Sequence, residues 1–411
     1  SHLSGDLHIT NPGIWSMIPD TIFVNAKELI DDGIDLGGKY LDISRIPASK
    51  QLDEITTSLS IMISLLSKEA SQEIVLDGLV GLFAKHSKSL PELEQKLTNA
   101  FATASTTSEY NKSSTNVSIR LSLGSDTKII NSIINAYKNY TKITPTPKIS
   151  LIIDYDKGKI SDVSQVISEI ISIGGKVMFA KGQTSSSGIT NGSTKTNMPL
   201  SIILQSVSIN LPRLAFESNK DETYFRARLA LLMKPALSSM ALRKKDISDV
   251  TRRGLNPILA KNTQYMQKSS VSLVVNLVGL KEAVFNILGF KDNKEGREIL
   301  HKVIQTAVDV GAKKGKELGD SVAICMTGTD SSTRFATLDG QKYGKNSTLN
   351  SMEGDSYSDK IIIDASEVSN YTSKSDPISE CNKFSKLFNG GLFVTLNIDK
   401  DAKVPEIKKS I

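Results

Sequence analysis

The chain has 411 residues, of which 39% are hydrophobic and 23% charged, a composition that excludes a disordered protein and supplies enough apolar surface for a large core. The 50 Lys and Arg residues exceed the 44 Asp and Glu residues only slightly, so the net charge of +6 does not imply specific nucleic-acid binding. Length alone leaves open two or three average domains or one large α/β barrel with insertions.

Strands and helices alternate through the first half of the chain. Apolar residues three and four apart between Gln51 and His86 predict one long helix or a pair of helices. Strict alternation over Val117–Leu121 predicts a strand. Further strands are predicted at 21–24, 148–153 and 176–179, and further helices at 91–104, 126–140 and 162–173.

A polar segment interrupts this alternation. Between Lys181 and Asn197 the sequence is dominated by Gly, Ser, Thr and Asn, with almost nothing to bury. A loop of about 17 residues inside a compact domain is usually functional or disordered. We therefore expect an exposed or site-lining loop here.

The second half returns to the same alternation. A strand is predicted from Leu200 to Leu211 and ends at Pro212, and a helix runs from Asp221 towards Leu242, with Pro235 marking a kink or break. Further strands are predicted at 270–277, 322–325, 360–363 and 392–398, and further helices at 281–288 and 294–318. The recurrent alternation predicts an α/β fold in which helices cover a central sheet or barrel.

Several classes of site are excluded by the residues present. The only thiols, Cys325 and Cys381, are too few for a disulfide framework or a four-cysteine metal site, and they favour a reducing cytoplasm. The four histidines are isolated, so no metal site is predicted. The sequence holds no Gly-x-Ser-x-Gly, His-Glu-x-x-His or P-loop motif, and no apolar run approaches the roughly 18 residues of a membrane span.

One turn has the composition of an anion site. It follows the strand ending at Cys325 and precedes a predicted helix that contains Arg334 and Phe335. Backbone N–H groups and hydroxyls at a helix start bind phosphate, but an ordinary helix capped by Asp330 or Ser331 explains the same residues. The local pattern leaves both interpretations open. The candidate phosphate-binding residues are Thr327, Gly328, Thr329, Asp330, Ser331 and Ser332.

Four ordered motifs carry a family resemblance. Val207–Glu217 reads V-S-I-N-L-P-R-L-A-F-E and is followed by Asp221 and Glu222, while Leu277–Ala283 reads L-V-G-L-K-E-A. Asp330–Asp339 reads D-S-S-T-R-F-A-T-L-D, and Asn389–Gly391 precedes a terminal strand. In this order they resemble the catalytic subunit of anaerobic (class III) ribonucleoside-triphosphate reductases, and weaker similarity at 6–9 and 22–33 extends the resemblance through nearly the whole chain.

The resemblance implies a fold of the ribonucleotide reductase and glycyl-radical enzyme type. That fold is a ten-stranded α/β barrel of two five-stranded halves with a finger loop through its middle. Residues 1–400 are accordingly expected to form a single reductase-like barrel domain, with a polar finger-like loop at 181–197. Residues 401–411 are expected to be a C-terminal tail.

The same resemblance implies that the radical chemistry is missing. In the family, the loop before the N-L-P-R strand carries the cysteine that becomes a thiyl radical, and an early strand carries its reducing partner. Here neither 181–197 nor the strand at Thr21 contains a cysteine, and a module with a glycyl-radical loop would begin where the printed sequence ends. We expect Cys325 and Cys381 to be non-catalytic, and no catalytic residue is assigned.

The predicted function is therefore that of a reductase homologue without reductase activity that retains nucleotide or phosphate binding at Thr327–Ser332. Asn210 is similar to the active-site-facing Asn of the family, although a strand-end residue bonded to backbone is an equal alternative. A structural or protein-interaction scaffold is the alternative function, and a reductase completed by another polypeptide is a third. No metal or organic cofactor is predicted beyond a bound nucleotide. The expected partners are a nucleoside triphosphate and a second copy or another protein, with no specific nucleic acid and no membrane.

Overall fold

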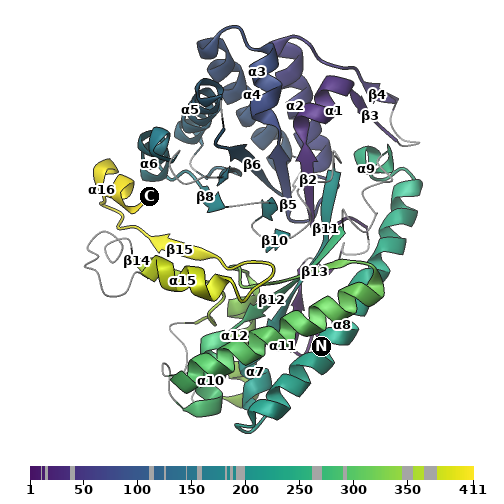
Figure 1. The fold of residues 1–411 in the computed structure, drawn as a ribbon. Coiled ribbons are helices and arrows are strands. Elements are labelled where there is room, and N and C mark those ends of the chain that lie inside the picture. The colour runs from purple at the N-terminus through teal and green to yellow at the C-terminus, as the bar shows by residue number, and fades with distance from the viewer. Residues whose placement is uncertain are drawn as a thin grey trace.

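The structure, a computed structural model, contains a curled mixed sheet with helices around it (Figure 1). It describes residues 1–10, 12–13, 17–37, 42–110, 115–124, 126–144, 146–154, 160–180, 183–185, 188–190, 200–261, 271–289, 294–344, 355–364 and 377–411. In this part of the chain the main sheet has nine strands. None of the helices in these ranges is long and apolar enough to cross a membrane.

The first half of the sheet consists of neighbouring parallel strands joined through helices. In sheet order these are β2 (Thr21–Asn25), β5 (Glu73–Asp77), β6 (Asn116–Ser122), β7 (Ile149–Asp154) and β8 (Val177–Ala180). The helices of this half are α1 (Ala26–Asp32), α2 (Leu52–Leu66), α3 (Leu79–His86), α4 (Leu90–Tyr110), α5 (Thr127–Ile143) and α6 (Ser164–Ser172). Parallel strands need such helical crossovers, which explains the alternation in the sequence.

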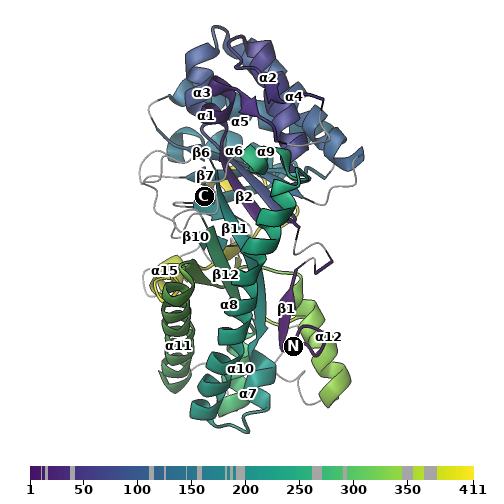
Figure 2. The same cartoon turned by 90° about the vertical axis from the view of Figure 1, so that its right-hand side faces the viewer.

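The second half is also parallel within itself and joins the first half antiparallel. Its strands are β11 (Leu200–Asn210), β12 (Val271–Val278) and β13 (Ser321–Cys325), with β11 paired to β2 and, further along the same strand, to β1 (Leu7–Ile9). Its helices are α7 (Leu211–Phe216), α8 (Glu222–Arg252), α9 (Pro257–Lys261), α10 (Leu280–Leu288), α11 (Lys294–Leu318) and α12 (Ser331–Tyr343). Figure 2 shows β1 beside α12 at the N-terminal end of the chain.

The Asn389–Gly391 motif lies against strand β13. The Asn389 side chain imitates a peptide group, because its Oδ1 accepts from Ile324 N at 2.7 Å and its Nδ2 donates to Val322 O at 2.9 Å. A parallel bridge joins Met326 to Leu392, and β15 (Val394–Asn397) then pairs parallel with β14 (Ile361–Asp364). Closure into a ten-stranded barrel stays a prediction.

The two faces of the sheet bury different side chains. Ile22 and Val24 of β2 belong to the main core under the helices, whereas Phe23 between them packs on the opposite face. There it joins Val75, Ile152, Ile203, Val274, Ala323 and Cys325, contributed by strands of both halves. The hairpin of β9 (Gln183–Ser185) and β10 (Gly188–Thr190) contacts β12 and β13 through β10. The rest of the predicted finger-like loop lies outside the described residues.

Strand β5 was not predicted. The segment Gln51–His86, expected as one or two helices, forms α2, then β5, then α3. The apolar run of β5 fits a helical face as well as a buried strand, so periodicity alone does not separate them. Gly78 ends the strand with a φ of +80°, a backbone conformation that favours glycine.

The sequence predicted a kink or a break at Pro235, and the helix does not break there. Helix α8 runs without interruption through Pro235 for 31 residues. Pro235 lies on the exposed side, while Leu229, Met233 and Leu237 are fully buried. A proline inside a helix costs about 3 kcal/mol, and burial of several large side chains exceeds that cost.

The C-terminal segments are helical. Helix α15 (Pro377–Ser385) precedes the Asn389–Gly391 motif, and residues 401–411, expected as a tail, contain α16 (Val404–Ser410). Ile407 of α16 is buried, and α16 packs on α6. A short pair, β3 (Ile34–Asp35) and β4 (Arg45–Ile46), completes the described strands.

Candidate functional site

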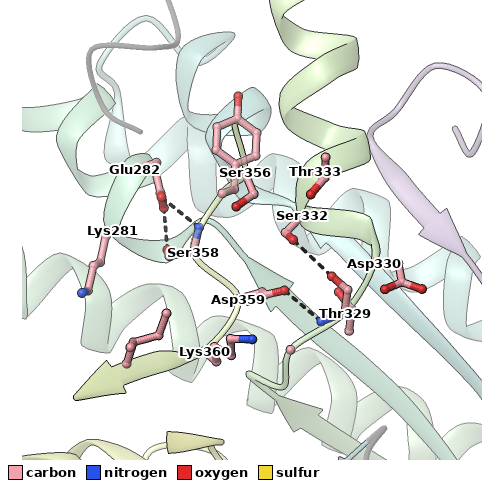
Figure 3. A pocket seen from close by; sticks show the side chains of 13 residues that line it. Lys281, Glu282, Thr329, Asp330, Ser332, Thr333, Ser356, Ser358, Asp359 and Lys360 are labelled. Atoms are coloured by element: carbon pink, nitrogen blue, oxygen red, sulfur yellow. Dashed lines mark hydrogen bonds between the residues drawn. The ribbon is translucent and has the colours of Figure 1, made fainter. Parts of the chain in front are cut away.

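A cavity of about 590 Å³ lies at the carboxyl ends of β12 and β13 (Figure 3). Three segments enclose it: the start of α10, the turn into α12, and the stretch that leads into β14. The lining residues are Lys281, Glu282, Gly328, Thr329, Asp330, Ser332, Thr333, Ser356, Tyr357, Ser358, Asp359, Lys360 and Ile362. Ligands of α/β proteins often bind beyond the carboxyl ends of parallel strands, where helices begin.

Hydroxyl groups set the shape of the turn into α12. Thr327 is buried and donates from Oγ1 to Asn276 Oδ1 at 2.6 Å, which fixes the turn to β12. Thr329 Oγ1 and Ser331 Oγ lie 2.5 Å apart, and Ser332 Oγ donates to Thr329 O at 3.1 Å. Asp330 occupies the N-cap position but makes no side-chain capping hydrogen bond. The hydroxyls of the turn therefore make these side-chain hydrogen bonds, and the Asp330 carboxylate does not cap the helix.

Positive groups surround the cavity. The positive ends of α10 and α12 border it, and each is a place where an anion is stabilised. Lys281 is the second residue of α10. Lys360 lies over the turn, since a Cβ added to Gly328 would meet Lys360 Cδ at 3.2 Å and Nζ at 3.4 Å. The site thus combines two helix starts with two ammonium groups.

Three carboxylates also line the cavity, and two of them have defined partners. Glu282 is buried and accepts from Ser358 N at 2.9 Å and Ser358 Oγ at 2.6 Å. Asp359 Oδ2 accepts from Thr329 N at 2.8 Å. Asp330 is exposed. Figure 3 shows the contacts of Glu282 and Asp359 as the links between the walls of the cavity.

A buried polar network lies behind the cavity. Asp339 is fully buried, and its Oδ1 accepts from Arg213 Nε at 2.6 Å, with Nη2 of the same guanidinium at 2.5 Å. Its Oδ2 accepts from Asn210 Nδ2 at 3.0 Å and from Tyr357 Oη at 2.9 Å. Burial alone would lower the pKa of Arg213, but the Asp339 carboxylate raises it. Arg213 is therefore charged and paired in the interior.

The far end of α12 is anchored as well. Glu217 accepts from Arg228 at 2.6 Å, from Lys342 at 2.9 Å and from the Tyr343 hydroxyl. Burial alone would raise the pKa of Glu217, but these hydrogen bonds lower it to about 2. The helix that carries the turn is thus tied to α7 and α8 at its C-terminal end.

The structure separates the predicted site residues into two groups. Gly328, Thr329, Asp330 and Ser332 line the cavity, whereas Thr327 and Ser331 are fully buried and do not. Asn210 is also fully buried and does not line the cavity. It donates to Gly5 O and Asp339, and it caps α7 by accepting from Arg213 N at 3.2 Å.

Sequence reasoning missed four charged lining residues, Lys281, Glu282, Asp359 and Lys360. The first two lie in the L-V-G-L-K-E-A motif, and this motif was the signal in the sequence that could have marked them as site residues. The last two lie just before β14 in a stretch without a motif, so only the fold brings them to the turn.

The two cysteines occupy separate places. Cys325 is buried on β13 and donates from Sγ to Gly390 O at 3.1 Å, whereas Cys381 is part of α15 and partly exposed. Among the side chains that the structure describes, no group of three or more His, Cys, Asp and Glu could hold a metal ion.

Comparison with known proteins gives one family and one fold. A family model described as anaerobic ribonucleoside-triphosphate reductase matches residues 136–411. The Thermotoga maritima anaerobic ribonucleotide reductase in complex with dATP and CTP superposes with a TM-score of 0.70 at 16% identity, over 99% of this chain and 74% of that chain. The same enzyme with citrate in the active site superposes with a TM-score of 0.70 at 16% identity, over 100% of this chain and 81% of that chain.

A third structure, described as an anaerobic ribonucleotide reductase, gives a TM-score of 0.72 at 16% identity, over 99% of this chain and 70% of that chain. At this level of identity the superpositions establish a shared fold. No curated protein matches the sequence.

Proposed function

The chain belongs to the anaerobic ribonucleoside-triphosphate reductase family, and from that premise we propose that it binds the phosphate chain of a nucleoside triphosphate in the cavity between α10 and α12. The observation that carries the proposal is the geometry of this cavity. Two helix starts border the cavity, Lys281 and Lys360 line it, and the Lys360 ammonium lies at the turn into α12. The Thermotoga maritima homologue was solved with dATP and CTP, which supports a nucleotide as the ligand class.

The backbone at Gly328 suits this ligand. Its φ is not in the left-handed region, so the residue is not required by the conformation of the turn. An added Cβ would instead press on the Lys360 side chain, the group that we assign to the phosphate. The absence of a side chain therefore leaves room for a cation and an anion to meet at the turn.

Replacing Lys360 by Met should weaken binding of a nucleoside triphosphate about tenfold, because a charge-assisted hydrogen bond to phosphate contributes about 1.5–3 kcal/mol. Titration calorimetry on the folded protein measures the effect. Lys316→Met, on the exposed side of α11, is the matched control and should leave the affinity unchanged. If wild type binds no nucleoside triphosphate at millimolar concentration, the proposed function fails and the scaffold alternative is favoured.

We further propose that these 411 residues do not reduce ribose by themselves. Abstraction of the 3′ hydrogen and the following reduction need thiols at the finger and on an early strand, and neither 181–197 nor β2 contains one. Cys325 on β13 donates a hydrogen bond from its thiol to the Gly390 carbonyl, which supports a structural role for this cysteine.

Purified chain, tested under anaerobic reducing conditions with an activating partner, should therefore form no deoxynucleotide above background. Deoxynucleotide formed above background by the purified chain with its activating partner would contradict this proposal. Product formed only after addition of a second polypeptide that carries thiols and a glycyl radical would favour the third alternative, a reductase completed by another chain.

The proposed architecture is the complete ten-stranded barrel. The parallel bridge at Met326 and Leu392 supports it, because it places β15 and β14 after β13 and makes the second half equal to the first in strand number. A second copy or another protein as partner, and a cytoplasmic location, are retained as predictions.

A further inference from the structure

The turn that we assign to phosphate already holds an anionic group from the chain itself. Thr329 N donates to Asp359 Oδ2 at 2.8 Å, and the Asp359 residue is only 8% exposed. A backbone N–H in the turn that leads into a helix is a type of donor that a phosphate oxygen accepts from. The Asp359 carboxylate therefore occupies a position that a bound phosphate would use.

Asp359 differs from the other two carboxylates of the cavity. Glu282 accepts from Ser358 N and Ser358 Oγ, which belong to the opposite wall and not to the turn. Asp330 is exposed and makes no side-chain capping hydrogen bond. Of the three carboxylates that line the cavity, Asp359 is the one that accepts a hydrogen bond from a backbone N–H of the turn, among the contacts of the residues that the structure describes.

The backbone on both sides of Asp359 is anchored. Ser358 O accepts from Gly279 N at 2.6 Å, and Ile361 N donates to Phe393 O at 3.1 Å. Tyr357 is held by Asp339 through its hydroxyl. Release of the Thr329 amide therefore requires rotation of the Asp359 side chain and leaves the wall of the cavity in place.

On the basis of the proposed function, we propose that Asp359 competes with the ligand for the Thr329 amide and so raises the affinity that an anion needs in order to bind. Every anion that binds to the Thr329 amide must first break the same hydrogen bond to Asp359. A single phosphate group makes few other contacts with the site, so its binding affinity becomes negligible. A chain of phosphates makes more contacts and carries more charge, so it still binds. The site is thereby restricted to polyphosphate-bearing ligands.

Titration calorimetry with tripolyphosphate and with inorganic phosphate tests this competition. Asp359→Ala frees the amide and should tighten binding of both probes at least tenfold, the fold-change that corresponds to one charge-assisted hydrogen bond. Asp359→Asn removes the charge but keeps an acceptor for Thr329 N, so we expect a gain of less than about threefold. Asp330→Asn removes the same charge from the same cavity without freeing an amide, and should match Asp359→Asn.

The outcomes separate this inference from the proposed function. If wild type binds tripolyphosphate but Asp359→Ala binds it no more tightly than Asp330→Asn, the competition is overturned and the phosphate site stands. If wild type and every variant fail to bind tripolyphosphate at millimolar concentration, the proposed function itself fails. Should Asp359→Ala lose its thermal unfolding transition, Asp359→Ser replaces it with the same tenfold expectation, because its hydroxyl is too short to reach the amide.

Discussion

Replacing Asp339 by Ala is expected to lower the free energy of unfolding by about 3 kcal/mol, the low end of the typical effect of removing one partner of a buried ion pair, because Arg213 Nη1 keeps Asp6 Oδ1 at 3.4 Å. Arg213 is 1% exposed and would lose the carboxylate that its Nε and Nη2 contact. Asn210 and Tyr357 would lose an acceptor at the same time. Urea denaturation followed by circular dichroism measures the change.

The control for this variant lies on the same helix. Asp330→Ala removes an exposed carboxylate that makes no side-chain capping bond, and surface changes of this kind usually alter stability by less than about 0.5 kcal/mol. Similar unfolding midpoints for the Asp339 and Asp330 variants would show that the buried network does not stabilise the fold.

A second large effect is expected at Gly390. A Cβ at this position would lie 2.3 Å from Cys325 Sγ and 2.8 Å from Ala323 Cβ, so the segment would have to move away from β13. Overpacking of this type costs about 1–3 kcal/mol, and the backbone hydrogen bond from Gly390 N to Ile324 O would be weakened as well. We expect Gly390→Ala to destabilise the protein by about 3 kcal/mol.

Thermal unfolding of Gly390→Ala and of Gly13→Ala tests the close approach directly. A Cβ at Gly13 meets nothing within 4 Å, so that substitution should leave the melting temperature unchanged. Hydrogen exchange at the Ile324 amide, which donates to Asn389, should accelerate in the Gly390 variant alone. Equal melting temperatures for both variants would mean that the strand edge tolerates the added atom.

The motifs behind the family resemblance contribute buried polar contacts more than ligand contacts. Asn210 and Arg213 of the N-L-P-R motif meet Asp339 of the third motif. Glu282 of the second motif holds Ser358, next to Tyr357, which Asp339 holds. Buried and hydrogen-bonded polar groups of this kind specify how elements pack, so the motifs define the walls of the cavity.

Local patterns in the sequence were sufficient for most of the elements. The helix at 294–318 was predicted with its observed bounds, and the strand before Pro212 was predicted to within one residue, because periodicity and proline act over a few positions. The strand-to-helix turn at 327–333 was also found from composition alone, and Gly328, Thr329, Asp330 and Ser332 do line the cavity. Strand β5 was missed because a short apolar run has no periodicity that distinguishes it from a helix.

The sequence by itself therefore determined the α/β alternation, the family and the position of the turn, since each of these depends on residues that are neighbours along the chain. Only the tertiary structure decided which groups face that turn. Asp359 reaches Thr329 across 30 positions, and Asn210 joins Asp339 across 129. Contacts of such separation arise when parallel strands bring their carboxyl ends to one edge of the sheet, and no local pattern encodes which side chains then meet.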